Sequence, residues 1–299
     1  AASTPLSNFE ANMDYREIED PSIFFTLKAR MDYKKIKEND EFLVWTTTPW
    51  CIPGNLAIAI GNNITYSRIL LKNTYYWIAK ERLQELKDFD FEVIDESLGS
   101  DLVGAEYIPA YDEFSDEYTN GAFRLIHSDD TNTESGSGLV SQAPAYGESD
   151  FYTLKNAGID SIVDPVTMSG RFDSTVKGLE NKYVKDADEI IIKQLEERGL
   201  LFSKTVEKHS YPFCWRTGKP LIYKAIPTWF VNVEKIRERM VELNNETHWV
   251  PGFIGDKRFS NWLANARDWA ISRNRYWGSC IPIWINKDNP EDLICIGSI

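Results

Sequence analysis

The sequence predicts an α+β protein, with a core rich in β-barrel strands, peripheral helices, and a smaller, mainly helical C-terminal segment. Short β-rich runs recur roughly every ten residues between Ile23 and Val166, a spacing typical of barrels and sandwiches. Helical periodicity is confined to a few stretches, and after about residue 205 the composition becomes rich in proline and aromatic residues. We therefore expect an N-terminal linker (1–22), a β-barrel domain (23–205) and a mainly helical segment (206–299).

The expected strands share β-branched and aromatic residues bounded by turn residues. They span residues 42–48, 55–61, 65–73, 74–80, 91–96, 122–129, 138–144 and 161–166.

Four stretches predict helices, at residues 79–89, 149–158, 186–201 and 233–245. In the third, Asp186 as N-cap and Glu189 three residues later form a capping-box pattern, and Gly199 supplies the C-terminal stop. Gly158 closes the second in the same way.

Composition excludes several classes of protein. With 299 residues and 42% hydrophobic content, the chain is long enough to bury a large core. The sequence contains neither a basic, apolar leader nor an apolar run of about 18 residues, so we expect a cytoplasmic chain that does not span a membrane. Four scattered cysteines predict reduced thiols and no metal site, and without a glycine-rich phosphate loop we expect no cofactor.

The net charge of −13 argues against a protein that coats nucleic acid nonspecifically. Residues 252–277 are locally basic and interleaved with tryptophans, a mixture that suits an RNA strand. The alternative, which we favour, is that the apolar residues form the core face of an amphipathic helix. The basic residues are Lys257, Arg258, Arg267, Arg273 and Arg275, and the apolar ones Phe259, Trp262, Leu263, Ala266 and Trp269.

Three consecutive threonines, Thr46, Thr47 and Thr48, close the first expected strand in "WTTTPWCIPGN". In a strand the first and third share one face, and Pro49 should end the strand at about Thr48. Such a cluster of hydroxyls can hold a polar ligand or a water molecule. Alternatively, threonine is present only because it suits strands.

Together with "GSGLVSQAPAYGESDF" (136–151), this motif resembles the editing insertion, or connective peptide, of isoleucyl-tRNA synthetases of the eukaryotic cytosolic type. The resemblance continues through "STPLSNFEA", "HSYPFCWRTGKPLIYKAIPTWFV" and "WAISRNRYWGSCIPIW", and so covers essentially the whole chain. Valyl and leucyl relatives carry an arginine after the second threonine, which favours the isoleucyl branch. The aminoacylation motifs HIGH and KMSKS do not occur, so we expect an excised insertion that does not activate an amino acid.

The resemblance implies hydrolytic editing of tRNA(Ile) misacylated with valine, because a binding pocket rejects a side chain one methylene smaller by only about 10- to 200-fold. The expected partners are the 3′ acceptor end carrying valine and the remainder of the synthetase, and we expect a monomer. Thr46, Thr47, Thr48 and Asp150 are the expected catalytic residues, with Asp150 also holding the α-ammonium of the substrate. The expected substrate-binding residues are Trp50, Asn55, Gly138, Ser141, Gln142 and Asp150. The three histidines are expected to be structural.

One departure from the family motif bears on selectivity. Ser141 stands where the family has a histidine that helps to exclude isoleucine. With the smaller side chain, the editing pocket excludes isoleucine less strictly, or Gln142 and neighbouring loops compensate. The alternative function is a module that binds the tRNA acceptor end with weak or lost editing. A third reading, a small-molecule hydrolase using Asp150 as base, lacks a second placed acid or nucleophile.

Overall fold

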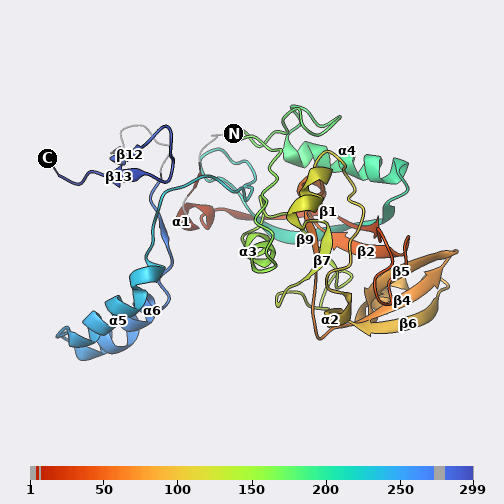
Figure 1. Cartoon of the computed structure of the whole chain (residues 1–299), viewed down its shortest axis with the longest axis horizontal. Helices are drawn as coiled ribbons and strands as arrows, with labels where there is room; N and C mark the ends of the chain where they lie inside the picture. The colour runs from red at the N-terminus through yellow and green to blue at the C-terminus, as the bar shows by residue number, and fades with distance from the viewer. Residues whose placement is uncertain (1–4, 7, 273–279, 299) are drawn as a thin grey trace. The chain divides into compact units, whose positions relative to one another are not determined.

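Nine strands in the first part of the chain form one mixed sheet (Figure 1). Its main path runs β6-β4-β5-β2-β8-β3-β7, with β1 beside β2 and β9 beside β1. The computed structural model describes residues 5–6, 8–272 and 280–298. The strands are β1 (Tyr15–Lys28), β2 (Glu41–Thr46), β3 (Ala57–Ile60), β4 (Thr65–Leu71), β5 (Thr74–Ala79), β6 (Glu92–Leu98), β7 (Arg124–His127), β8 (Val140–Gln142) and β9 (Leu201–Pro212). The predicted α+β class is confirmed.

Three pairs of described strands in this sheet are parallel, one of them at its β7 end. β2 runs parallel to β5 and to β8, and β3 runs parallel to β7. Other pairs are antiparallel, including β3 with β8 between the parallel pairs, and β4 with β5 and with β6. Long connections are needed to bring parallel strands together, so residues far apart in sequence meet at β8.

Seven described helical segments accompany this sheet in the first unit. They are α1 (Asn8–Ala11), η1 (Pro49–Gly54), η2 (Lys80–Leu86), α2 (Gly99–Leu102), η3 (Ser115–Asn120), α3 (Glu148–Asn156) and α4 (Val184–Glu197). The apolar face of α4 buries Ile191, Ile192 and Leu195 in the main core and packs against η1. The segment that follows the threonines is therefore covered by α4.

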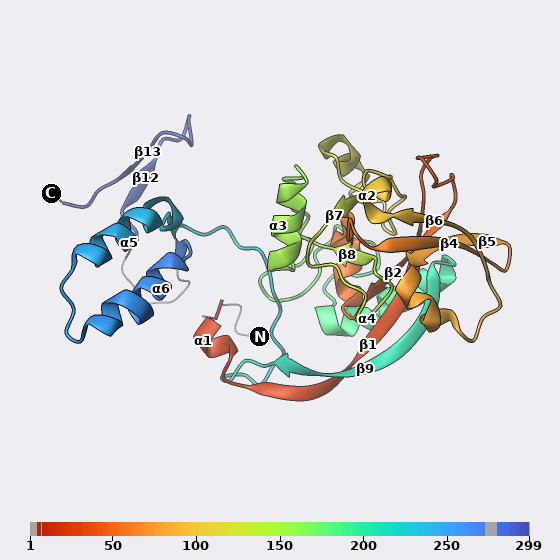
Figure 2. The ribbon, with the colours of Figure 1, turned by 90° about the horizontal axis from the view of Figure 1, so that it is seen from below.

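A long antiparallel ribbon joins the two ends of the sheet domain. β1 and β9 pair from Tyr15 opposite Pro212 to Phe25 opposite Leu201, and Figure 2 shows the pair curving beneath the sheet. Residues 15–22, expected in the N-terminal linker, belong to β1, and the expected boundary at residue 205 falls inside β9. Contacts instead divide the chain into Ala1–Ala225 and Ile226–Ile299.

Three elements predicted in the first unit differ from the structure. Residues 161–166 form no strand, because only Val166 makes an isolated bridge, to Phe172. Residues 80–86 form a 3-10 helix rather than an α-helix. The helix expected from Asp186 begins two residues earlier, and its N-cap, Tyr183, makes no side-chain cap hydrogen bond. Gly199, with φ of +69°, follows its C-terminus as predicted.

The second unit holds β10 (Phe230–Val231), η4 (Glu234–Ile236), α5 (Arg237–Glu246), the π-helix η5 (Ile254–Phe259), α6 (Ser260–Ala264), β11 (Trp269–Ala270), β12 (Ile283–Ile285) and β13 (Leu293–Cys295). The amphipathic core helix predicted around residues 259–269 is wrong in extent, because α6 ends at Ala264 and Trp269 lies in β11. Of its apolar residues, Leu263 is buried, whereas Trp262 and Trp269 are exposed. Arg273 and Arg275 lie outside the described residues.

No helix among the described residues is long and apolar enough to cross a membrane.

Candidate functional site

The three threonines form a corner between β2 and η1. β2 ends at Thr46, two residues earlier than predicted, and Pro49 begins the 3-10 turn. The Thr46 hydroxyl accepts a hydrogen bond from the Thr48 backbone N–H at 3.1 Å, and the two hydroxyl oxygens lie 3.3 Å apart. Thr46 and Thr48 thus lie on the same side, as the strand pattern predicts.

The middle threonine is different. Thr47 is partly exposed, and its hydroxyl has no hydrogen-bond partner among the residues that the structure describes. Its hydroxyl therefore keeps its full capacity to donate to and accept from a ligand or water.

The second motif lies directly beside this corner. Trp45 pairs with Val140 in the parallel β2–β8 contact, and its backbone N–H donates to the Leu139 carbonyl at 3.3 Å. The two segments are about a hundred residues apart in sequence. Parallel strands can pair only when a long connection joins them, and this stretch of chain supplies it. The structure therefore brings the threonine corner and residues 138–142 together at one end of β8.

Gly138 shapes the entrance to β8. Its φ is +76°, and a Cβ built on it would lie 2.5 Å from the Cβ of Ala79. Its carbonyl accepts a hydrogen bond from the Tyr66 hydroxyl at 2.8 Å. Any side chain here would strain the backbone and collide with β5, so Gly138 has a structural role in holding the motif.

Replacing Gly138 with alanine is expected to destabilise the fold by about 2–4 kcal/mol, because the left-handed backbone and the collision with Ala79 add to each other. Gly158 is the matched control, since its φ is +75° but no atom lies within 4 Å of the position that a Cβ would take there. Urea unfolding of both variants should show a smaller loss for Gly158→Ala, of about 1 kcal/mol. Equal losses would contradict the close approach at Gly138.

Asn55 joins the two motifs from within the core. Its Nδ2 donates to the Ser141 hydroxyl at 2.9 Å and to the Ala57 carbonyl at 2.8 Å, and its Oδ1 accepts from the Tyr107 hydroxyl at 2.6 Å. The residue is only 7% exposed. A buried amide with its groups occupied holds neighbouring segments in register, and Asn55 does so for η1 and β8.

Gln142 follows Ser141 in β8, so the two side chains leave opposite faces of the strand. The Gln142 side chain is buried, and its Nε2 lies 3.4 Å from the Ser141 carbonyl. Ser141 itself is half-buried. The geometry gives Gln142 poor access to the space that a larger side chain at Ser141 would fill.

Asp150 lies in the first turn of α3 and reaches back to the end of β8. Its Oδ2 accepts a hydrogen bond from the Ala143 backbone N–H at 2.8 Å. Burial raises the pKa of this carboxyl above its ordinary value, while the Ala143 N–H lowers it. A bound cation would favour the ionised form, so the partly buried carboxylate is suited to hold an ammonium.

The Trp50 ring is buried beside Tyr146. Its side chain is 3% exposed, and its ring centroid lies 4.8 Å from that of Tyr146. The backbone N–H of Trp50 donates to Asp188 Oδ1 at 2.8 Å. Contact of this ring with substrate stays a prediction, because the structure gives it a packing role.

Asp188 is a residue that the sequence reasoning missed. It lies on α4 and is 3% exposed. The sequence did contain a sign of its role, namely an acidic residue on the apolar face of a helix. Asp188 precedes Ile191, Ile192 and Leu195 at the helical spacings of three, four and seven residues.

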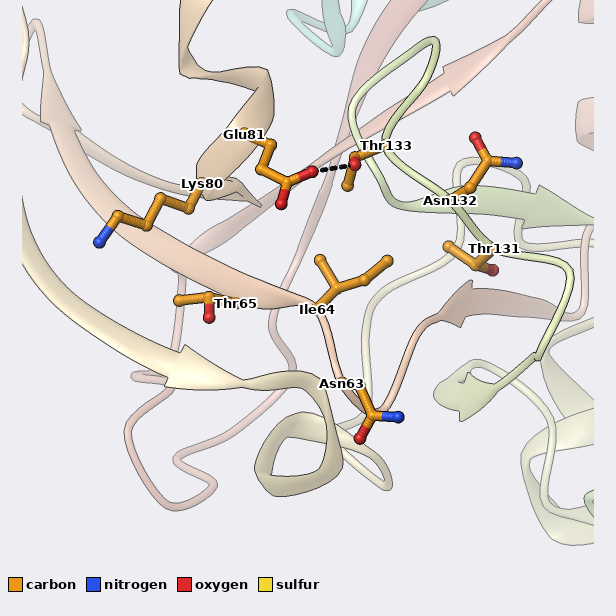
Figure 3. A pocket seen from close by; sticks show the side chains of 8 residues that line it. All are labelled: Asn63, Ile64, Thr65, Lys80, Glu81, Thr131, Asn132 and Thr133. Atoms are coloured by element: carbon orange, nitrogen blue, oxygen red, sulfur yellow. Dashed lines mark hydrogen bonds between the residues drawn. The ribbon is translucent and has the colours of Figure 1, made fainter.

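A hollow of about 380 Å³ lies elsewhere in the first unit (Figure 3). It is lined by Asn63, Ile64, Thr65, Lys80, Glu81, Thr131, Asn132 and Thr133. Figure 3 shows the Thr133 hydroxyl bonded to Glu81, and Lys80, the only cation of this lining, forms an ion pair with Glu96. None of the predicted site residues lines this hollow. Within the described part of the chain, no group of three or more His, Cys, Asp or Glu residues could hold a metal ion.

The chain is similar to known proteins over its whole length. Residues 1–299 match the family model for class I tRNA synthetases (I, L, M and V). The sequence is 44% identical to the cytoplasmic isoleucine–tRNA ligase of Caenorhabditis elegans, over 100% of this chain and 26% of that protein. It is 45% identical to the isoleucine–tRNA ligase of Bdellovibrio bacteriovorus, over 99% of this chain and 28% of that protein. The chain thus spans about a quarter of the length of these relatives.

Solved structures also match. The editing domain of the P. knowlesi cytosolic leucyl-tRNA synthetase is 9% identical, with a TM-score of 0.48, over 64% of this chain and 97% of that one.

Proposed function

Because this chain belongs to the class I tRNA synthetases of the isoleucyl, leucyl, methionyl and valyl group, we propose that it edits misacylated tRNA by hydrolysing the ester of Val-tRNA(Ile). The observation that carries the proposal is the meeting of two distant motifs at β8. The threonine corner lies beside residues 138–142 through the Trp45–Val140 pair, and Asp150 bonds to Ala143 at the end of the same strand.

The chemistry assigned to each group follows from its surroundings. Asp150 holds the α-ammonium of the aminoacyl group by a charge-assisted hydrogen bond. The hydroxyls of Thr47 and Thr48 orient a water molecule and the terminal ribose. The water oxygen attacks the ester carbonyl carbon, the bond from that carbon to the ribose oxygen breaks, and the ribose oxygen takes up the proton that the attacking water releases. Orientation and fixed polar groups supply the acceleration.

The remaining assignments complete the proposal. The partners are the 3′ acceptor end of tRNA(Ile) carrying valine and the remainder of a synthetase, the chain is monomeric, and it acts in the cytoplasm. The relative from Caenorhabditis elegans, which is called cytoplasmic, supports the last assignment.

Deacylation of purified Val-tRNA(Ile) by the whole chain tests the proposal, with Ile-tRNA(Ile) as the paired substrate and protein-free reactions to measure spontaneous loss. We expect rapid hydrolysis of the valyl ester. A chain that binds the acceptor end without accelerating hydrolysis at high protein concentration would instead support the second candidate, a binding module. That candidate is favoured by Ser141, which replaces the family histidine and whose hydroxyl is already bonded to Asn55.

Replacing Ser141 with histidine is expected to sharpen selectivity. The imidazole adds volume at a half-buried position of β8, and one methylene in an apolar pocket is worth about 1–3 kcal/mol, or roughly 10- to 200-fold. Hydrolysis of Ile-tRNA(Ile) should fall by up to that factor, while hydrolysis of Val-tRNA(Ile) changes little. The two deacylation rates measured side by side check this.

The opposite pattern would mean that another group excludes isoleucine. If the unmodified chain already leaves Ile-tRNA(Ile) intact and Ser141→His slows hydrolysis of the valyl ester, the added ring overpacks a filled site. Ser141→Ala is the matched control, because it removes the hydroxyl that accepts from Asn55 without adding volume.

A further inference from the structure

Asp188 brings a buried carboxylate to the start of η1. The residue is 3% exposed on the apolar face of α4, and its Oδ1 lies 2.8 Å from the backbone nitrogen of Trp50. The first amides of a helical turn have no partner within the turn, so each needs an acceptor from elsewhere. In η1, Cys51 N–H bonds to the Thr48 carbonyl at 3.0 Å, and Trp50 N–H depends on Asp188.

Two hydrogen bonds, one of them to this carboxylate, hold the backbone of the corner on either side of Pro49. Thr48 N–H is held by the Thr46 hydroxyl on the strand side of Pro49, and Trp50 N–H is held by Asp188 on the other side. Both flanks of Pro49 are thus fixed, and only Thr47 has an unoccupied hydroxyl among the three threonines of this described segment.

We propose that Asp188 is a positioning residue, whose carboxylate anchors the η1 side of the threonine corner and thereby sets the direction of the Thr47 and Thr48 hydroxyls. The kinetic part of this inference rests on the proposed editing function. The anchoring itself does not, because it concerns a contact within the chain.

Charged and titratable groups face Asp188 from every element packed around it. Lys185 and Glu189 come from its own helix, the Trp50 N–H and Cys51 from η1, Asp20 from β1, and Tyr211 from β9. Lys185, the cation that acts on Asp188, is already 2.5 Å from Asp20 Oδ2, and His209 Nε2 lies 3.1 Å from the same oxygen. Asp188 therefore shares its cation with a second carboxylate.

The result is a carboxyl whose charge changes near neutral pH. Burial, which is the largest effect, and repulsion from Asp20 and Glu189 raise the pKa of Asp188 to about 7, against the lowering effects of Lys185 and the Trp50 N–H. When Asp188 is ionised, its hydrogen bond from Trp50 is charge-assisted and roughly twice as strong as a neutral one. The anchor should then be firmest above pH 7.

Two substitutions in the whole chain separate positioning from folding. Asp188→Leu removes the acceptor, and a misplacement of about 1 Å costs on the order of a hundredfold, so kcat for Val-tRNA(Ile) should fall tenfold to a hundredfold while KM stays within about twofold. Asp188→Asn keeps an oxygen for Trp50 N–H and should restore most of kcat at pH 6, where the Asp188 carboxyl is largely protonated. Glu196→Gln is the control, because Glu196 lies on the same helix, is exposed, and is not among the groups that shift the pKa of Asp188.

The pH dependence adds a measure that a purely structural residue would not affect. After spontaneous hydrolysis is subtracted, the ratio of kcat for the unmodified chain to kcat for Asp188→Asn should rise roughly three- to tenfold between pH 6 and pH 8. A ratio that does not vary with pH would overturn the role of the charge.

The anchor can also be observed without any substrate. In the whole chain labelled with ¹⁵N at tryptophan, the backbone amide of Trp50 should shift with a midpoint near pH 7, and this shift should vanish in Asp188→Asn. Suppose that the unmodified chain hydrolyses Val-tRNA(Ile), but its Trp50 amide does not titrate and Asp188→Leu keeps the full kcat. This result overturns the inference and leaves the proposed function intact. A titrating amide in a chain without deacylation overturns the function and leaves the anchor intact.

Discussion

Replacing Asp150 with asparagine is expected to reduce hydrolysis of Val-tRNA(Ile) by about 30-fold to several thousandfold, with the fold unchanged. The loss corresponds to about 2–5 kcal/mol for removing one partner of a hydrogen-bonded charge pair. Asparagine keeps an oxygen within reach of the Ala143 N–H, which Asp150 Oδ2 accepts at 2.8 Å. The substitution therefore removes the charge that would hold the α-ammonium without removing the contact that joins α3 to β8.

Single-turnover deacylation with protein in excess measures this effect directly. Asp150→Ala should be at least as inactive and also slightly less stable, because the Ala143 N–H would lose its acceptor. Asp160→Asn makes the same change of charge at an exposed position just beyond α3 and should leave the rate unaltered. Full activity in Asp150→Asn would remove Asp150 from the proposed mechanism.

Replacing Thr47 and Thr48 together with alanine is expected to lower the turnover of Val-tRNA(Ile) by about 100- to 1000-fold, the range found when a group that stabilises developing charge is removed. Affinity for the tRNA should change far less, because these hydroxyls act mainly on the transition state. The comparison requires kcat from single turnovers and Kd from binding of deacylated tRNA(Ile).

The structure supplies a matched set of single variants for this test. Thr47→Ala removes a hydroxyl that has no partner among the described residues, so its effect on turnover carries no structural cost. Thr46→Ala removes the acceptor of the Thr48 N–H and should mainly loosen the corner. If affinity falls and turnover does not, the threonines bind the tRNA without taking part in hydrolysis.

The local features of the candidate site could be predicted from the sequence. Pro49 lacks a backbone N–H, and so the strand carrying the threonines had to end near it. Alternation in a strand placed Thr46 and Thr48 on one side, and their hydroxyl oxygens lie 3.3 Å apart. Gly158 and Gly199 marked the ends of two helices, where the left-handed backbone of each follows the last turn. These predictions succeed because each depends on neighbouring residues alone.

Other features depended on residues that are distant in sequence. The β1–β9 ribbon joins Tyr15 to Pro212, and neither segment carries a local signal for the other. The predictions of a strand at 161–166 and of a tryptophan helix were wrong for the same reason. The conformation of a short apolar run depends on which segments pack against it. The packing of the Trp50 ring against Tyr146 likewise joins two segments that are far apart in sequence.

By itself, the sequence determined the α+β class, the threonine corner and the resemblance that relates the chain to isoleucyl-tRNA synthetases. Only the tertiary structure placed that corner beside β8, filled the hydrogen bonds of Asn55 and brought Asp188 to the amide of Trp50. The physical reason is that a strand end or a turn is set by the torsional limits of a few residues, whereas an acceptor for a buried amide is supplied by whichever segment the completed core places there.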